Sequence, residues 1–130
     1  MKSRIIAAVL LILFSLSVSI AALLYSKNSV EDTQHSIEKL RMQIKSGEED
    51  PYDLADRISR DWKKKEHIIS TYTPHREIEE VSMMIEVLPQ MVQDMHTCDT
   101  LDEALYQCEM ILAILRHLAT IEVPYIRNLL

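Results

Sequence analysis

The chain has 130 residues and a formal net charge of -6 at pH 7. This length is enough for one small domain with its own core. The acidic balance argues against nucleic acid as a partner, because phosphate backbones bind surfaces rich in lysine and arginine. The single glycine leaves little material for hairpin turns, and the abundance of Leu, Ile, Met, Glu and Lys favours helices. We therefore expect an all-α protein.

An uninterrupted apolar stretch runs from Ile5 to Leu24. Seventeen of its twenty residues are apolar, three are serine and none is charged. As a helix that rises about 1.5 Å per residue, it would span the roughly 30 Å of a bilayer core. Serine hydroxyls are tolerated there because they can donate to the helix's own carbonyls. The sequence predicts a transmembrane helix within residues 1–26, followed by a helical domain of residues 27–130.

The charges beside this span predict its orientation. Lys2 and Arg4 precede the span, whereas Lys27 is soon followed by Glu31 and Asp32. By the positive-inside rule the N-terminus lies in the cytoplasm and the C-terminal domain lies outside the cytoplasmic membrane. We expect a single-pass protein in that membrane.

A signal peptide is the alternative to a permanent anchor. Ser19-Ile20-Ala21 has the small-x-small pattern that a signal peptidase accepts, so cleavage after Ala21 would release a secreted helical protein. The apolar run is longer than the usual 7 to 15 or so residues of a signal peptide and ends at an interfacial Tyr25. We therefore favour an uncleaved signal-anchor.

Residues 29–46 are predicted to form a linker helix into the domain. A narrow seam with spacings of three and four consists of Val30, Thr33, Ile37, Leu40 and Ile44. Gly47 follows where a helix end favours a left-handed residue. Because nothing between Leu24 and Val30 breaks a helix, we expect one rod from about Arg4 to Ser46, with Ser26, Asn28 and Ser29 as its weak point.

Two further helices are predicted to begin at prolines. Asp50 can cap the second helix, with Pro51 in its first position, and the Trp62 that it carries should pack in the core. The third helix follows Thr73-Pro74 and carries one apolar stripe. Pro89 lies inside this stripe and removes a backbone hydrogen bond, so we expect a kink or a break there.

The fourth predicted helix has the clearest start signal. Thr97 to Asp99 is predicted as a turn, and Thr100 with Glu103 has the S/T-x-x-E form of a capping box. The helix should end before Pro124, leaving residues 123–130 as an apolar tail that packs back or meets a partner. The expected architecture is an N-terminal transmembrane helix followed by a small antiparallel bundle of three to four helices.

A family resemblance rests on features spread along nearly the whole chain. They are the basic start with one apolar span, the helix carrying Trp62, the segment His75-Arg76-Glu77-Ile78, a heptad-like pair of helices and the final Asn128-Leu129-Leu130. Together they resemble the short bacterial proteins of domain of unknown function family 4363. The resemblance implies a single-anchor, extracytoplasmic helical protein with no assigned activity, so no catalytic residues can be carried over from the family.

Candidate chemistry is sparse. His75 and Glu79 are four residues apart and share a helix face, which makes them weak candidates for a metal site. However, the sequence contains no E-x-x-H pair, no H-E-x-x-H or G-x-S-x-G motif and no glycine-rich phosphate loop. We expect no metal, no cofactor, no catalytic residue and no enzymatic activity. Cys98 in a turn and a buried Cys108 are favoured over a disulfide.

These observations favour a non-enzymatic interaction or scaffold module of the bacterial envelope, which binds another envelope protein or itself. A ligand or cation sensor that uses His75 and its neighbouring glutamates is the alternative. Five methionines would mostly fill the core, but they could also line a groove for a partner's helix between the third and fourth helices: Met83, Met84, Met91, Met95 and Met110.

Overall fold

The computed structural model describes residues 1–47, 49–72 and 75–129, and the side chains of 1–47, 49–71 and 76–120. This part of the chain contains helices and no strand, which confirms the predicted all-α class. The elements are α1 (Lys2–Ser46), α2 (Tyr52–Tyr72), α3 (His75–Gln93) and α4 (Cys98–Leu129).

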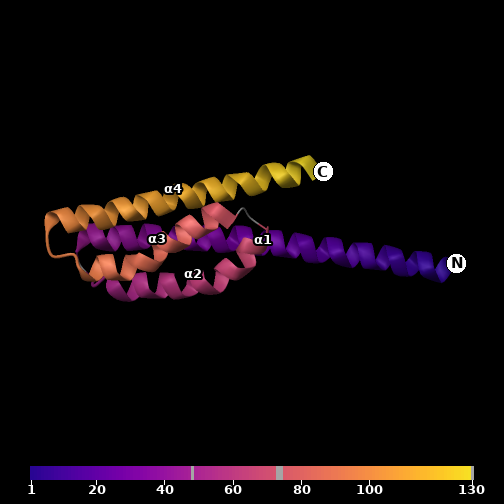
Figure 1. The fold of residues 1–130 in the computed structure, drawn as a ribbon, viewed down its shortest axis with the longest axis horizontal. Helices are drawn as coiled ribbons and strands as arrows, with labels where there is room; N and C mark the ends of the chain where they lie inside the picture. Colours follow the sequence, from indigo (N-terminus) through magenta and orange to yellow (C-terminus); the bar gives the residue numbers. More distant parts are fainter. Residues whose placement is uncertain (48, 73–74, 130) are drawn as a thin grey trace.

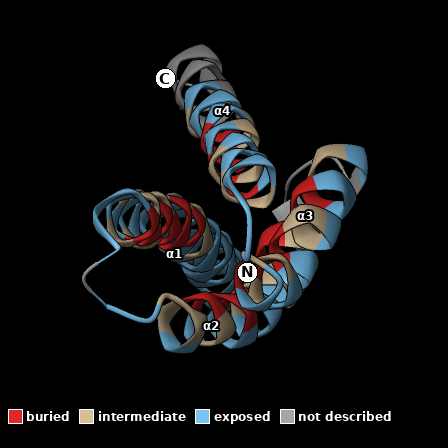
Figure 2. Cartoon of the chain, turned by 90° about the vertical axis from the view of Figure 1, so that its left-hand side faces the viewer, coloured by how far each residue is buried: buried red, intermediate tan, exposed pale blue. Residues whose placement is uncertain are grey.

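The helices form a ring in which each runs antiparallel to the next (Figure 1). Over the described residues α1 packs on α2, α2 on α3, α3 on α4, and α4 returns to α1, whereas the diagonal pairs are not in contact. Figure 2 shows the four helices around the buried centre. This is an up-and-down four-helix bundle. The second half of α1 is one of its members, and the first half extends beyond it.

The anchor and the linker helix are one continuous helix, as predicted. α1 runs from Lys2 to Ser46 without a break at Ser26, Asn28 or Ser29. At its end Gly47 has φ 64°, and its backbone N–H donates to the Gln43 carbonyl at 3.0 Å. Glycine accepts this left-handed conformation without the steric cost that a Cβ would add.

The core is built from one apolar face of each helix. Trp62 is 1% exposed and is the largest of the fully buried side chains, as expected of it. Its indole Nε1 donates to Ser82 Oγ on α3 at 2.8 Å, which satisfies the polar end of a buried ring. The other large side chains in this centre are Val30, Ile37, Leu40, Ile69, Ile78, Ile85, Leu88, Ile111, Leu112, Leu115 and Leu118.

The start of α2 lies one residue later than predicted: the helix begins at Tyr52, so Pro51 precedes the first helical position that we assigned to it. Asp50 Oδ1 accepts a hydrogen bond from the Tyr52 backbone N–H at 3.0 Å. The Pro51 carbonyl accepts the first helical bond, from the Ala55 N–H at 3.0 Å. Because proline has no N–H to leave unpaired, this position costs nothing in hydrogen bonding.

The start of α4 corrects the prediction by three residues. The helix begins at Cys98, so Thr97 is its cap and Thr100 occupies the third helical position. The two threonines bond reciprocally: Thr100 N–H donates to Thr97 Oγ1 at 3.2 Å, and Thr97 N–H donates to Thr100 Oγ1 at 3.0 Å. A hydroxyl at the third position thus performs the task that we assigned to Glu103.

Two prolines lie inside helices and break neither of them. α3 is not broken at Pro89, because the buried Ile85, Leu88 and Val92 hold the helix to the core on both sides of it. α4 continues past Pro124 to Leu129, so the prediction that it ends before Pro124 was wrong. A proline removes only one helical hydrogen bond, and the bonds on either side remain available to extend the helix.

Candidate functional site

The first half of α1 is the main candidate site. It is long and apolar enough to cross a membrane, and it lies near the N-terminus. Every large apolar side chain from Ile5 to Ile20 is at least 46% exposed, because no other helix of the described chain packs on this part of α1 (Figure 1). Water solvates such a surface poorly, and its transfer to lipid is favourable by about 25 cal/mol for each Å² of apolar surface removed from water. The site therefore fits a bilayer.

Two of the three serines within this segment are accommodated as predicted. Ser17 Oγ donates to the Leu13 carbonyl at 2.8 Å, and Ser19 Oγ donates to the Ser15 carbonyl at 2.9 Å. Both bonds run four residues back along the helix, so neither hydroxyl requires water.

The junction between span and bundle lies within one helix. Side chains up to Ala21 are exposed, Ala22 and Leu23 are half-buried, and Ser26 is the first fully buried residue. Thr33 Oγ1 in turn donates to the Ser29 carbonyl at 2.8 Å. Because the helix does not break here, the span and the bundle are joined by continuous helix.

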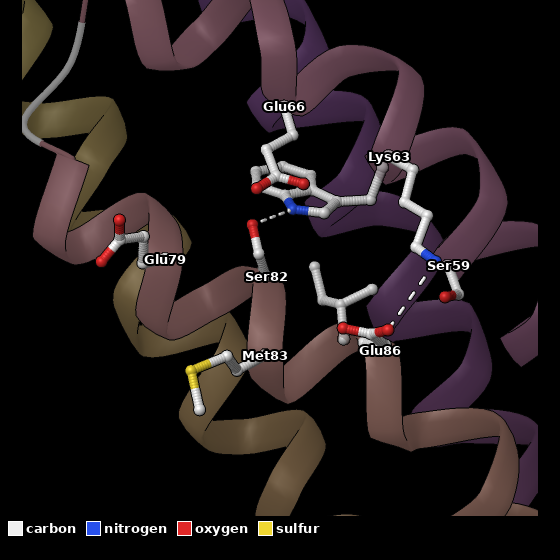
Figure 3. Close-up of a pocket in the computed structure, with 9 residues that line it drawn as sticks. Ser59, Lys63, Glu66, Glu79, Ser82, Met83 and Glu86 are labelled. Carbon is white, nitrogen blue, oxygen red and sulfur yellow. Dashed lines mark hydrogen bonds and ion pairs between the residues drawn. The ribbon is translucent and has the colours of Figure 1, made fainter.

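A surface cavity of about 240 Å³ lies between α2 and α3 (Figure 3). Its floor is Trp62 with its bond to Ser82, and its rim carries Glu66, Glu79 and an ion pair of 3.7 Å between Lys63 Nζ and Glu86 Oε1. Both partners of that pair are more than 60% exposed, so the pair contributes little to stability. The open rim suits contact with a polar surface rather than enclosure of a substrate.

A second cavity, of about 260 Å³, lies between α3 and α4. Met110, Ala113 and Ile114 form its apolar wall, and Glu77 and Glu80 line the α3 side. His117 Nε2 lies 3.3 Å from Glu77 Oε1 across this cavity. Of the methionines predicted for a groove here, Met110 lines it, whereas Met84 and Met95 pack against the core.

Of the two weak metal candidates, Glu79 is the one whose side chain the structure describes. Glu79 is exposed and lines the cavity of Figure 3, and the His75 side chain lies outside the described residues. Among the residues searched, no group of three or more His, Cys, Asp or Glu side chains could hold a metal ion. The sensor hypothesis therefore stays a prediction.

The two cysteines are free thiols, with Cys98 exposed and Cys108 buried. Cys98 is the first residue of α4 and does not lie in a turn as predicted. Burial raises the pKa of the Cys108 thiol from 9.0 to about 11; nearby Arg41 lowers it and Glu109 raises it by smaller amounts. A protonated, buried thiol is a poor nucleophile, which makes Cys108 a packing residue.

The cross-helix pairs were not predicted from the sequence. Ser82 lies twenty residues from Trp62, and His117 lies forty from Glu77, so no local spacing connects either pair. A polar residue within an apolar stripe, such as Ser82 in α3, was the one sign in the sequence that a buried polar group needed a partner there.

One family model covers most of this architecture. The model described as Domain of unknown function (DUF4363) matches residues 20–129, from the end of the apolar span through the four-helix bundle. The chain belongs to this family. The match confirms the resemblance noted from the sequence, and the family's description assigns no activity. No curated protein and no solved structure matches the chain.

Proposed function

We propose that this DUF4363 protein is a non-enzymatic scaffold of the bacterial cell envelope, anchored in the cytoplasmic membrane with its N-terminus inside and its bundle outside. The observation that carries the proposal is α1, one helix that is exposed and apolar over residues 5–20 and packed in a bundle core from Ser26 onward. Such a helix holds a folded domain at a fixed height above the membrane.

The surface of the bundle supports binding of another protein. Met83 and Val87 lie one turn apart on α3 and are 68% and 47% exposed, and Tyr106 on α4 is 63% exposed. Exposed methionine and tyrosine side chains are typical of protein-binding surfaces. The bound protein would be another envelope protein or a second copy of this chain.

Thiol labelling tests the orientation. Cys98 is exposed at the start of α4, at the end of the bundle opposite the anchor (Figure 1), and Cys108 is buried. After reduction, a membrane-impermeant maleimide should label Cys98 in right-side-out membranes, and the C98S variant should remain unlabelled. Labelling only after the membranes are opened would place the bundle in the cytoplasm and refute the proposed topology.

Photo-crosslinking tests the binding role. A photoreactive residue at Met83 should give a discrete crosslinked product in native membranes. The matched control is the same residue at Lys64, an exposed position on α2. Recovery of neither a partner nor a dimer from the Met83 position would contradict the scaffold role.

A further inference from the structure

The end of α4 lies level with the end of the apolar span along the bundle axis. Two ion pairs show which residues of α4 and α1 are level: Arg116 Nη2 lies 3.8 Å from Glu38 Oε1, and Arg41 Nη1 lies 3.8 Å from Glu109 Oε1. Because the two helices are antiparallel, a residue a given number of positions after an ion-paired residue of α4 is level with the residue the same number of positions before its partner in α1. Leu129 lies 13 residues after Arg116, so the first pair makes it level with Tyr25, which lies 13 residues before Glu38. Counted in the same way from Glu109 and Arg41, the second pair makes Leu129 level with Ala21.

Figure 1 shows the same relation directly. α4 extends past the described ends of α2 and α3, and its own end is level with the protruding part of α1 but set off to one side of it. α4 therefore extends further toward the N-terminal half of α1 than α2 and α3 do. If residues 5–24 span a bilayer, the end of α4 lies at the membrane surface and not in free solution.

The sequence at this end suits that depth. Residues 123–130 read VPYIRNLL, in which apolar residues accompany one tyrosine and one arginine. Tyrosine is enriched at the boundary between headgroups and acyl chains, and arginine near a membrane can extend its charge to the phosphates. Tyr25, level with this region on α1, is of the same interfacial type.

Backbone chemistry limits how deep the helix end can lie. The last four carbonyls of a helix have no partner within it, and Pro124 also leaves the Thr120 carbonyl without its usual N–H donor. Unpaired carbonyls are costly in hydrocarbon but are satisfied by the water of the headgroup layer. The end of α4 therefore fits the headgroup layer better than the bilayer core.

We infer that residues 121–129 of α4 form a second membrane contact, with the headgroup layer of phospholipids in the leaflet that faces the bundle. This inference rests on the proposed anchoring by α1. With two contacts at different positions around the ring, the membrane would fix the tilt of the bundle as well as its height.

Depth-dependent quenching of tryptophan fluorescence tests this inference in the full-length protein. Two single-tryptophan variants are made in a W62F background: Y125W reports the end of α4, and F14W reports the middle of the span. Each is reconstituted in phosphatidylcholine vesicles that carry bromine either close to the headgroup or near the acyl-chain end. We expect Y125W to lose most of its emission with the shallow bromine and F14W with the deep one.

The two positions separate failure of the inference from failure of the anchor. If F14W is quenched by deep bromine but Y125W responds only to aqueous acrylamide, the second contact is refuted and the anchor stands. The contact is also refuted if Y125W is protected from both lipid and aqueous quenchers, since the end of α4 would then be covered by protein. If F14W is not quenched by either lipid, the anchor and the inference both fail.

A folding control accompanies each variant. Circular dichroism should show the same helix content as the parent chain. If W62F lowers the melting temperature, Y125W and F14W are made instead in the chain that keeps Trp62. The quenching of the new tryptophan is then the difference between each variant and the parent. The parent itself is the negative control, because its only tryptophan is buried in the bundle.

Discussion

The two halves of α1 have the same backbone conformation and opposite surroundings. From Ile5 to Ile20 the large apolar side chains point outward all round the helix and are exposed. From Ser26 to Ile44 the buried side chains follow one seam, and charged residues such as Glu31 and Lys39 occupy the exposed positions. A helix that is apolar on every side suits lipid, whereas a helix that is apolar on one stripe suits a bundle. The pattern of burial, and not the helix itself, distinguishes the two environments.

Charge in the middle of the span should have the largest effect. Replacing Ile12 and Leu13 by arginine costs about 5 to 7 kcal/mol for insertion, at roughly 2.5 to 3.5 kcal/mol for each arginine. We expect the I12R/L13R protein to move from the membrane fraction into the carbonate-soluble fraction. The control variant I12L/L13I should remain in the membrane. Retention of the arginine variant would mean that the first half of α1 does not need lipid.

Replacing one leucine in each half of α1 should affect the stability of the bundle differently. L40A removes a side chain with no exposed surface, and such substitutions cost about 2 to 5 kcal/mol. We expect a lower melting temperature for the bundle of the full-length protein in detergent. The matched variant L10A, in the exposed half, should leave the melting temperature unchanged. Equal effects of the two substitutions would contradict the assignment of the halves.

Alkaline pH should destabilise the bundle through Cys108. Its pKa is raised by burial from 9.0 to about 11, so the folded state holds the proton more tightly than the unfolded state does. The resulting stability is complete below pH 9.0 and is lost as the pH rises toward about 11; two pKa units correspond to on the order of 2 to 3 kcal/mol. Denaturant unfolding of the parent and of C108A at pH 8 and pH 10.5 measures this loss. The two proteins should differ in the slope of stability against pH, and parallel slopes would exclude Cys108 as the cause.

The cap of α4 should give the smallest effect, at the end of the bundle far from the span. T97A removes the hydroxyl that accepts the Thr100 N–H, at a cost of about 1 kcal/mol. A decrease in melting temperature should be seen for T97A, whereas T97S keeps an accepting oxygen and should resemble the parent. Because this end does not meet the membrane, the loss should be the same in micelles and in vesicles. A loss that depends on lipid would mean that this end also contacts the bilayer.

Local signals in the sequence predicted the end of α1 and, to within one residue, the start of α2; the predicted cap at Thr73-Pro74 lies outside the described residues. Gly47 and Asp50 act through hydrogen bonds that span two to four residues, so their roles can be read without knowing the fold. The start of α4 was misplaced because Thr97 and Thr100 both carry a hydroxyl that can cap, and the glutamate after Thr100 matched the more familiar pattern. The end of α4 was misplaced because proline disfavours a helix without forbidding it.

The sequence by itself determined the properties that depend on one helix at a time: the apolar span, the seam of α1, the all-α class and the burial expected of Trp62. Only the tertiary structure decided which helices are neighbours in the ring, that Ser82 accepts the Trp62 N–H, and that His117 faces Glu77. Those pairings depend on the rotation and register of packed helices. Many side chains contribute a little to each of these quantities, and no short motif encodes them.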